Sequence, residues 1–373
     1  MADSASELAH LSFTLALHEV LATRGGDTCY SPYSMASALG LAGQAARGET
    51  AAELAGLLTG HGADLAAHAG LLRRAAVLAA AGEDEEDTPV LAVSNTLWAW
   101  EQLPLKPEFL DELAAWPSGA VRTAPFVADP DAARRLINTE VAEATHQLIP
   151  QLLEPGSVDE DTVASIVNAL YLRAAWTLPF PESETRDADF HAPDGTRRVP
   201  TMHHAEWLGY TAAQGWQAVT LPVAGGLQAV VLLPDGDLAE QESQLTAETL
   251  RELLDDQGRA MVNLALPRFR LDLRSPMTEV LQTLGVRTMF TARADLGGLT
   301  DDDRLAVSEV LHQAVLRIDE QGLEGAAATA VMMRLVSLPS GEPVTVRADR
   351  PFLFLVRHPE TGAVYFLARV VRP

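Results

Sequence analysis

Few residues in this sequence have the spacing that catalysis or metal binding requires. His203 and His204 form the one adjacent histidine pair, and the pair lacks the further ligands of a zinc site, so we interpret it as a surface feature. The run Asp301–Asp303 lacks the glycine and the distal glutamate of a calcium loop. Nucleophile elbows, phosphate-binding glycine loops and zinc-protease motifs are missing from the sequence. The sequence therefore predicts no enzyme, no metal site and no cofactor.

One segment indicates a different kind of chemistry. Residues 320–333 lie between two strand-like regions and consist largely of small residues. Every second residue is uncharged, which defines one apolar face: Leu323, Gly325, Ala327, Thr329, Val331 and Met333. Glu324 falls on the opposite face. Such a segment is acceptable both as an exposed loop and as a buried central strand, so it has the properties of a two-state switch.

The surrounding pattern predicts the elements that hold this segment. Helices are predicted over 5–23, 31–42, 64–81, 106–115, 130–147 and 275–284. One strand is predicted to begin at Val90, and further strands are predicted over 162–172, 227–233, 261–272, 305–318, 344–347, 352–357 and 364–371. The run 162–172 is almost wholly apolar, which is typical of a strand buried on both faces. Because no linker separates the helical and strand-rich regions, we expect one continuous α+β domain over 1–373.

Composition and charge limit the kinds of partner and the cellular compartment that we expect for this protein. The formal net charge of −24 disfavours nucleic acid as a partner. No apolar run approaches the about 18 residues of a membrane span, and the start Met1-Ala2-Asp3 lacks a secretory signal. The lone cysteine, Cys29, excludes an internal disulfide framework and is expected to be a buried, inert thiol. We therefore expect a cytoplasmic protein, with release by a non-standard route as the alternative.

The segment 320–333 resembles the hinge of the reactive-centre loop in serpins, a family of serine protease inhibitors. The hinge pattern is a glutamate, any residue, a glycine, a small hydroxyl residue, a glutamate and an alanine-rich run. Here its positions are Glu320, Gly322, Leu323, Glu324, Gly325, Ala326, Ala327, Ala328 and Thr329. Other stretches resemble serpin motifs in the same order: Ser31-Pro32-Tyr33-Ser34, Asn168-Ala169-Leu170-Tyr171-Leu172, Leu266-Pro267-Arg268-Phe269, Val310-Leu311-His312, 348–354 and 366–373. The resemblance runs from about residue 7 to the end.

The resemblance implies a fold and a mechanism. The serpin fold has three β-sheets, eight or nine helices and an exposed reactive-centre loop, here at about 320–345. The resemblance implies that a polar cluster lies beneath the point where the main sheet opens, formed by Ser31, Ser34, Asn168 and His312. It also implies a monomeric inhibitor that traps a serine protease as a covalent acyl complex while its own loop inserts into the sheet.

The resemblance also places the cleaved bond. In inhibitory serpins the residue before the cut is the seventeenth from the hinge glutamate, which is Val336 here, followed by Ser337. Val336 favours elastase-like or subtilisin-like targets. A register one residue shorter gives Leu335 and chymotrypsin-like targets, and a register two residues shorter gives Arg334 and trypsin-like targets.

Leu323 departs from the family pattern. Inhibitory relatives usually carry threonine or serine there, and overpacking by a larger side chain costs about 1–3 kcal/mol. The sequence therefore predicts slower insertion and a leaky inhibitor, with a non-inhibitory serpin-fold protein (a substrate, chaperone or storage protein) as the alternative. Activation by heparin is not expected, because residues 61–82 contain only Arg73 and Arg74 as basic residues.

Overall fold

The structure is a computed structural model, and it describes residues 2–22, 25–60, 64–79, 89–113, 119–159, 162, 164–302, 305–323 and 342–373. Within these ranges the chain forms nine α-helices and fifteen strands, which confirms the α+β class. The helices are α1 (Ala2–Ala22), α2 (Pro32–Ala45), α3 (Gly48–Thr59), α4 (Leu65–Ala75), α5 (Pro107–Leu113), α6 (Pro130–Ala144), α7 (Leu238–Glu242), α8 (Ala247–Asp255) and α9 (Met277–Thr283). Short 3-10 turns are η2 (Glu182–Glu184), η3 (Ala224–Gly226) and η4 (Thr288–Phe290). None of the helices in the described ranges is long and apolar enough to cross a membrane.

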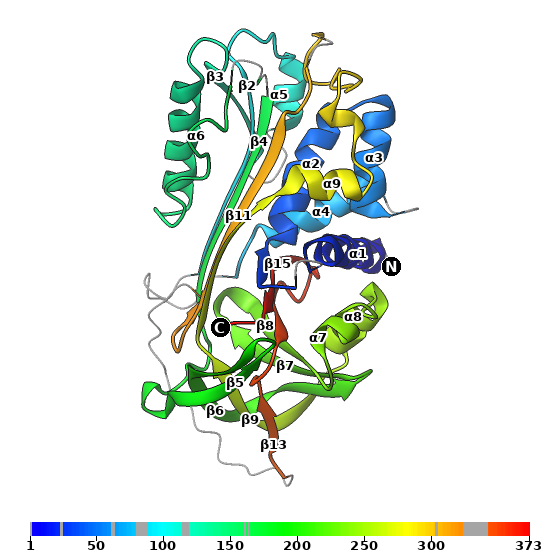
Figure 1. The fold of residues 1–373 in the computed structure, drawn as a ribbon. Helices are drawn as coiled ribbons and strands as arrows, with labels where there is room; N and C mark the ends of the chain where they lie inside the picture. Colours follow the sequence, from blue (N-terminus) through cyan, green and yellow to red (C-terminus); the bar gives the residue numbers. More distant parts are fainter. Residues whose placement is uncertain are drawn as a thin grey trace.

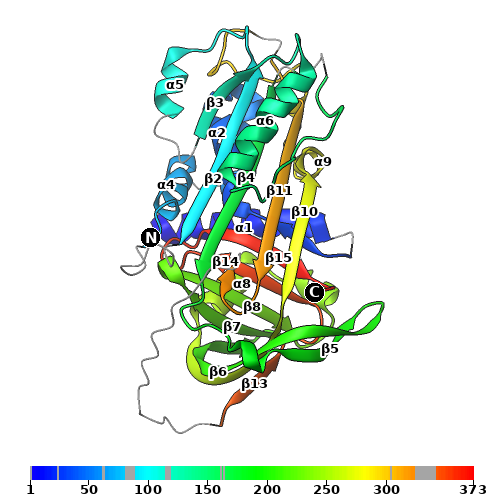
Figure 2. The ribbon, with the colours of Figure 1, turned by 90° about the vertical axis from the view of Figure 1, so that its left-hand side faces the viewer.

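Six strands form a sheet in the order β10-β11-β12-β4-β2-β3. Their bounds are β2 (Val90–Trp100), β3 (Gly119–Ala124), β4 (Ala164–Ala175), β10 (Phe269–Pro276), β11 (Glu309–Ile318) and β12 (Gly322–Leu323). Strands β11 and β4 pair directly and in parallel along 309–314 and 165–170, and β12 lies between them only at one end. Figure 2 shows the long strands of this sheet side by side, with α6 crossing the face toward the viewer.

The central strand β4 is buried along nearly its whole length. Helix α6 contacts β2, β3 and β4, and α2 also contacts β2 and β4. Figure 1 shows these two helices on opposite faces of the sheet. A mostly apolar sequence is typical of a strand covered on both faces, and the strand predicted over 162–172 is confirmed with the bounds Ala164–Ala175.

The other nine strands form a second hydrogen-bonded sheet, which β6 divides into two layers. Most of β6 pairs with β5 and β9, whereas its last residues pair with β7. One layer contains β5 (Arg186–Ala192), β6 (Gly195–Ala213), β9 (Gly258–Pro267) and β13 (Val344–Arg347). The other contains β7 (Trp216–Val223), β8 (Leu227–Pro234), β14 (Phe352–Arg357), β15 (Val364–Val370) and β1 (Thr28–Tyr30). Together with the six-stranded sheet, these layers make the three sheets that the serpin resemblance implies.

The predicted strands differ from the structure in two ways. The strand predicted over 261–272 is two strands, β9 and β10, which belong to different sheets. The chain changes sheet at Arg268, whose backbone N–H donates to the carbonyl oxygen of Pro200 at 2.9 Å. Strands β1, β3, β5, β6 and β7 were not predicted. Much of β5 and β6 is exposed, and polar residues interrupt their hydrophobic alternation.

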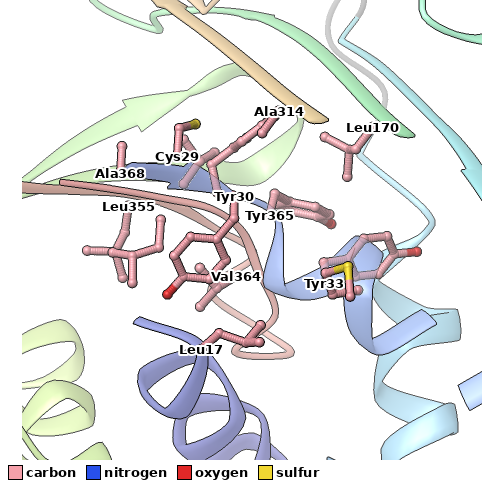
Figure 3. Close-up of a cluster of buried hydrophobic side chains, with 14 of the residues drawn as sticks. Leu17, Cys29, Tyr30, Tyr33, Leu170, Ala314, Leu355, Val364, Tyr365 and Ala368 are labelled. Carbon is pink, nitrogen blue, oxygen red and sulfur yellow. The ribbon is translucent and has the colours of Figure 1, made fainter. Parts of the chain in front are cut away.

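The main hydrophobic core lies where α2 packs against both sheets and α1 packs against α2 and β15. In Figure 3, Cys29, Tyr30 and Tyr365 from β1 and β15 lie near Leu170 of β4 and Ala314 of β11. All five residues are at most 3% exposed. The expectation that Cys29 is buried is confirmed, and burial raises the pKa of its thiol.

Candidate functional site

The segment predicted to switch between loop and strand begins inside the six-stranded sheet. Strand β11 ends at Ile318, the chain turns over 319–321, and β12 returns antiparallel to β11 with Leu323 paired to Ile318. On its other side, Leu323 pairs with Ala174 of β4. The first residues of the segment therefore already occupy the position of a strand between β11 and β4.

The side chain of Leu323 is 0% exposed and belongs to the main hydrophobic core. The sequence predicted that leucine here would overpack the sheet during insertion. The native fold already holds the side chain between β11 and β4, so that cost is not part of a later insertion step. Burial of a leucine side chain contributes about 2 kcal/mol relative to leaving it exposed. The departure from the family pattern thus anchors the hinge in the sheet.

The glycine at the hinge has a steric cause. A Cβ at Gly322 would lie 2.3 Å from the carbonyl oxygen of Ala174 and 2.8 Å from the Cα of Ala175. The preceding turn is held by Asp319, whose carboxylate accepts from the backbone N–H of Gln321 at 3.0 Å and of Gly322 at 3.3 Å. Only a residue without a side chain allows β12 to approach β4 this closely.

Glu320 ties this turn to neighbouring strands. Its buried carboxylate accepts from Arg268 Nε at 2.7 Å and from the hydroxyl of Thr185, and its backbone carbonyl accepts from the N–H of Phe180 at 3.0 Å. Burial acts to raise the pKa of Glu320, but the hydrogen bonds from Arg268 and Thr185 outweigh burial and hold the pKa below its ordinary value. At neutral pH the carboxylate is ionised and anchors the base of the hinge.

The four residues of the predicted polar cluster meet beneath the paired part of β4 and β11. Asn168 and His312 are register partners, Ser31 caps α2, Ser34 lies in its first turn, and all four are 0% exposed. His312 Nε2 accepts from the backbone N–H of Ser31 at 2.9 Å, so the proton is on Nδ1, which donates to Asn168 Oδ1 at 2.7 Å. Asn168 Nδ2 donates to Ser34 Oγ at 2.6 Å. The cluster joins α2 to both strands that must separate if the sheet opens.

A fifth member of the cluster, Asn95 of β2, was not predicted. It is 1% exposed, and its Oδ1 accepts from Asn168 Nδ2. Asn95 Nδ2 has no hydrogen-bond acceptor among the described residues. The available signal was an asparagine in a strand-forming stretch, where this residue is disfavoured unless a buried partner holds it.

Buried neutral histidines make stability depend on pH. Burial lowers the pKa of His312 and His10 to about 3 and that of His68 to about 4. The unfolded chain binds protons below about pH 6.5, whereas the fold keeps these rings neutral, so stability falls as the pH drops from there toward the folded pKa values. We expect a loss of about 2 kcal/mol per imidazole at about pH 5.

Urea unfolding of the protein and of His312→Gln at about pH 7.5 and about pH 5 measures this effect. The variant should lose about 2 kcal/mol less than the parent between the two pH values. Equal losses in both proteins would contradict a neutral His312 in the folded cluster.

Several predicted site residues lie outside the described residues. They are the hinge residues Glu324, Gly325, Ala326, Ala327, Ala328 and Thr329, the reactive-bond residues Val336 and Ser337, and the alternatives Leu335 and Arg334. Their roles stay predictions. The described chain stops at Leu323 in β12 and resumes at residue 342, just before β13.

The interpretation of His203 and His204 as a surface pair is wrong for one of them. The side chain of His204 is 10% exposed, and its ring centroid lies 5.2 Å from that of Phe180. The alternation of β6 turns His204 inward, whereas His203 Nδ1 lies 3.1 Å from the carbonyl oxygen of Thr201. In the part of the chain that the structure describes, no group of three or more metal-ligating side chains occurs.

The fold and this site define a class of protein. In this class a short strand, here β12, lies between one end of two parallel strands of a sheet, and a buried polar cluster lies beneath the point where those two strands pair directly. The family model Serpin (serine protease inhibitor) matches residues 7–373. The chain belongs to the serpin family.

Relatives from distant organisms match over most of the chain. The leukocyte elastase inhibitor of Bos taurus is 33% identical over an alignment of 360 residues that covers 93% of this chain and 93% of the relative. An uncharacterized serpin-like protein of Thermococcus kodakarensis is 32% identical over 366 residues, covering 97% of this chain and 84% of the relative. The structure of human thyroxine-binding globulin matches all of both chains with a TM-score of 0.86 at 23% identity, which is a likeness of fold.

Proposed function

We propose that this serpin inhibits a serine protease as a suicide substrate, and that cleavage at Val336–Ser337 drives the hinge into the six-stranded sheet. The observation that carries the proposal is the pairing of β12. Leu323 is antiparallel to both Ile318 of β11 and Ala174 of β4. A strand that continues from β12 therefore needs no change of direction or register.

Continuing this register assigns a partner to each inserted residue. Each step forward from Leu323 is one step back along both neighbours, so Thr329 falls between Asn168 and His312. Because Thr329 lies an even number of positions after Leu323, both side chains point to the same buried side. The Thr329 hydroxyl then replaces the direct hydrogen bond between Asn168 and His312, so neither buried group is left without a partner.

The same register gives the inserted strand its length. Met333, the last residue of the predicted apolar face, falls opposite Ala164, the first residue of β4. The apolar face from Leu323 to Met333 thus matches the length of β4. This agreement supports insertion along the full strand rather than only at its end.

The chemistry belongs to the protease. Its serine oxygen attacks the carbonyl carbon of Val336, the peptide bond breaks, and the amine of Ser337 leaves with a proton from the protease histidine. The new ester links Val336 to the protease while the freed hinge end gains a ladder of hydrogen bonds in the sheet. Hydrolysis of the ester needs a preorganised oxyanion hole and triad, so distortion of the tethered protease slows it by orders of magnitude. The inhibitor is then a substrate rather than an enzyme, and it acts as a monomer in the cytoplasm.

Val336 at the cut favours elastase-like or subtilisin-like targets, and Leu335 and Arg334 are the alternatives at shorter registers. The name of the bovine relative, leukocyte elastase inhibitor, supports the first. The alternative function is that of a non-inhibitory serpin, and the likeness in fold to a thyroxine-binding protein keeps this class open. The buried, uncharged Leu323 favours inhibition, because a hinge already seated in the sheet is the starting point of insertion.

Mixing the protein separately with elastase, chymotrypsin, trypsin and a subtilisin tests the proposal. We expect a band on a denaturing gel that survives boiling and has the combined mass of protease and inhibitor, because the ester is covalent. Mass spectrometry should find a released fragment that begins at Ser337. A fragment that begins at Val336 would instead assign the cut to Leu335. Complete cleavage by all four proteases, with no such band and full protease activity, would place the protein in the non-inhibitory class.

A further inference from the structure

The chain that follows the reactive loop forms β13, which lies at the end of the molecule away from α5. Figure 1 shows β13, where the loop ends, beside β9 and below β6. Val336 precedes Val344 by eight residues, which span at most about 28 Å. A protease domain of about 200 residues has a radius of gyration of about 16 Å. A protease bound at the proposed cleavage site is therefore large enough to touch the layer of β5, β6, β9 and β13.

This layer has one buried and one solvent-facing side. The inward side chains of β6, β9 and β13 are buried, and they include Leu208, Val262, Leu264 and Val346. The residues between them point outward, and the register pairs Trp207 with Met261 and Asn263 with Thr345. We call the outward set the outer face: Trp207, Arg259, Met261, Asn263, Thr345 and Arg347. Trp207 and Met261 are half-buried, and the other four are exposed.

The outer face carries positive charge in an acidic protein. The whole chain has 51 Asp and Glu against 27 Lys and Arg. Among the arginines of this layer, Arg186, Arg197 and Arg198 form ion pairs with Glu184, Asp194 and Asp189, whereas Arg259 and Arg347 lie on the outer face, which contains no carboxylate. At physiological salt, charges farther than about 8 Å are largely screened. An approaching protein surface therefore responds to Arg259 and Arg347 rather than to the charge of the whole chain.

The chemistry of the outer face is that of an interface. Its centre is the Trp207–Met261 pair, and Arg259 and Arg347 flank the pair without forming an ion pair to any described residue. Aromatic, methionine and arginine side chains are enriched where proteins bind each other. We propose that the outer face is a docking surface for the target protease, complementary to an acidic region with an apolar centre beside the protease active site. This inference rests on the inhibitory function proposed above.

One elastase-like serine protease in two forms tests it. Succinylation of surface lysines replaces positive by negative charge. For each form, the trapping rate is divided by the rate at which that form cleaves a free peptide of residues 324–345, which corrects for a change in intrinsic activity. Relative to the peptide, we expect the succinylated form to be trapped about 5-fold to 10-fold faster at about 0.15 M salt, with a smaller difference at about 1 M. Arg259→Glu should remove this preference, and Trp207→Ala should slow trapping of both forms by at least about 3-fold.

The matched control is Arg293→Glu, which makes the same charge change at an exposed site after η4, an element that packs on α3. It should leave both trapping rates unchanged. If the ratio of trapping rate to peptide cleavage rate is the same for both protease forms in the parent and in every variant, the docking surface is overturned while the inhibitory function stands. No covalent complex with either form would overturn both. Arg259 is exposed, so its variant keeps the test valid even where Trp207→Ala does not fold.

Discussion

Replacing Leu323 with arginine is expected to convert the inhibitor into a substrate. The leucine side chain is fully buried between Ile318 and Ala174, and an arginine there would place an unpaired guanidinium in the hydrophobic core. The variant therefore keeps residue 323 out of the native sheet, and insertion must then bury the charge at a cost of several kcal/mol, so insertion becomes slower than hydrolysis of the acyl-enzyme. Each about 1.4 kcal/mol added to the insertion barrier slows it about tenfold. We therefore expect more than about ten molecules of the variant to be consumed for each protease silenced.

Titration of protease activity against increasing inhibitor measures this stoichiometry, and a gel shows whether the loop is still cut at the same bond. Glu324→Arg is the matched control, because the same side chain is introduced one residue away on the opposite face of the predicted strand. The control should trap protease at nearly one to one. Equal stoichiometry for the two variants would contradict a requirement for the apolar face of the hinge.

Replacing Asn168 with alanine is expected to shorten the lifetime of the inhibitory state by more than about tenfold at about 37 °C. The change removes the acceptor for His312 Nδ1 and the donor to Ser34 Oγ, both fully buried. Each buried group left without a partner costs about 1–3 kcal/mol. In the proposed inserted state Thr329 stands between Asn168 and His312, so His312 keeps a hydrogen-bond partner in the variant. The substitution therefore destabilises the inserted state less than the native state, and the equilibrium shifts toward insertion.

Incubation of the protein followed by titration of remaining inhibitory activity gives this lifetime. Gln151→Ala is the control, because it removes an exposed side-chain amide that bonds only Glu154 among the described residues. The control should keep the parent lifetime. If Asn168→Ala also keeps the parent lifetime, the buried cluster does not hold the sheet closed.

Local patterns were sufficient for much of the fold. The apolar run around β4, the helices α1 and α6 and the last strands β14 and β15 were predicted because burial on one or both faces leaves a periodic signal along the chain. The apolar face that begins at Leu323 follows from the same periodicity. The α+β class followed from the helical and strand-rich regions along the chain. The meeting of Asn168 with His312 was predicted through the resemblance to serpins, which carries information about long-range contacts that periodicity lacks.

Contacts between distant segments were beyond the reach of these patterns. Asn168 bonds Ser34 across 134 residues, and Ser31 bonds His312 across 281 residues, while Asn95 joins them with no periodic signal. The position of Leu323 between β11 and β4 depends on how β12 pairs with both strands. The alternation of residues along one strand does not encode this pairing. The arginines of the outer face become a surface only when β6, β9 and β13 lie side by side. Sequence periodicity reports which side of an element is buried, and the choice of neighbours is made by packing in three dimensions.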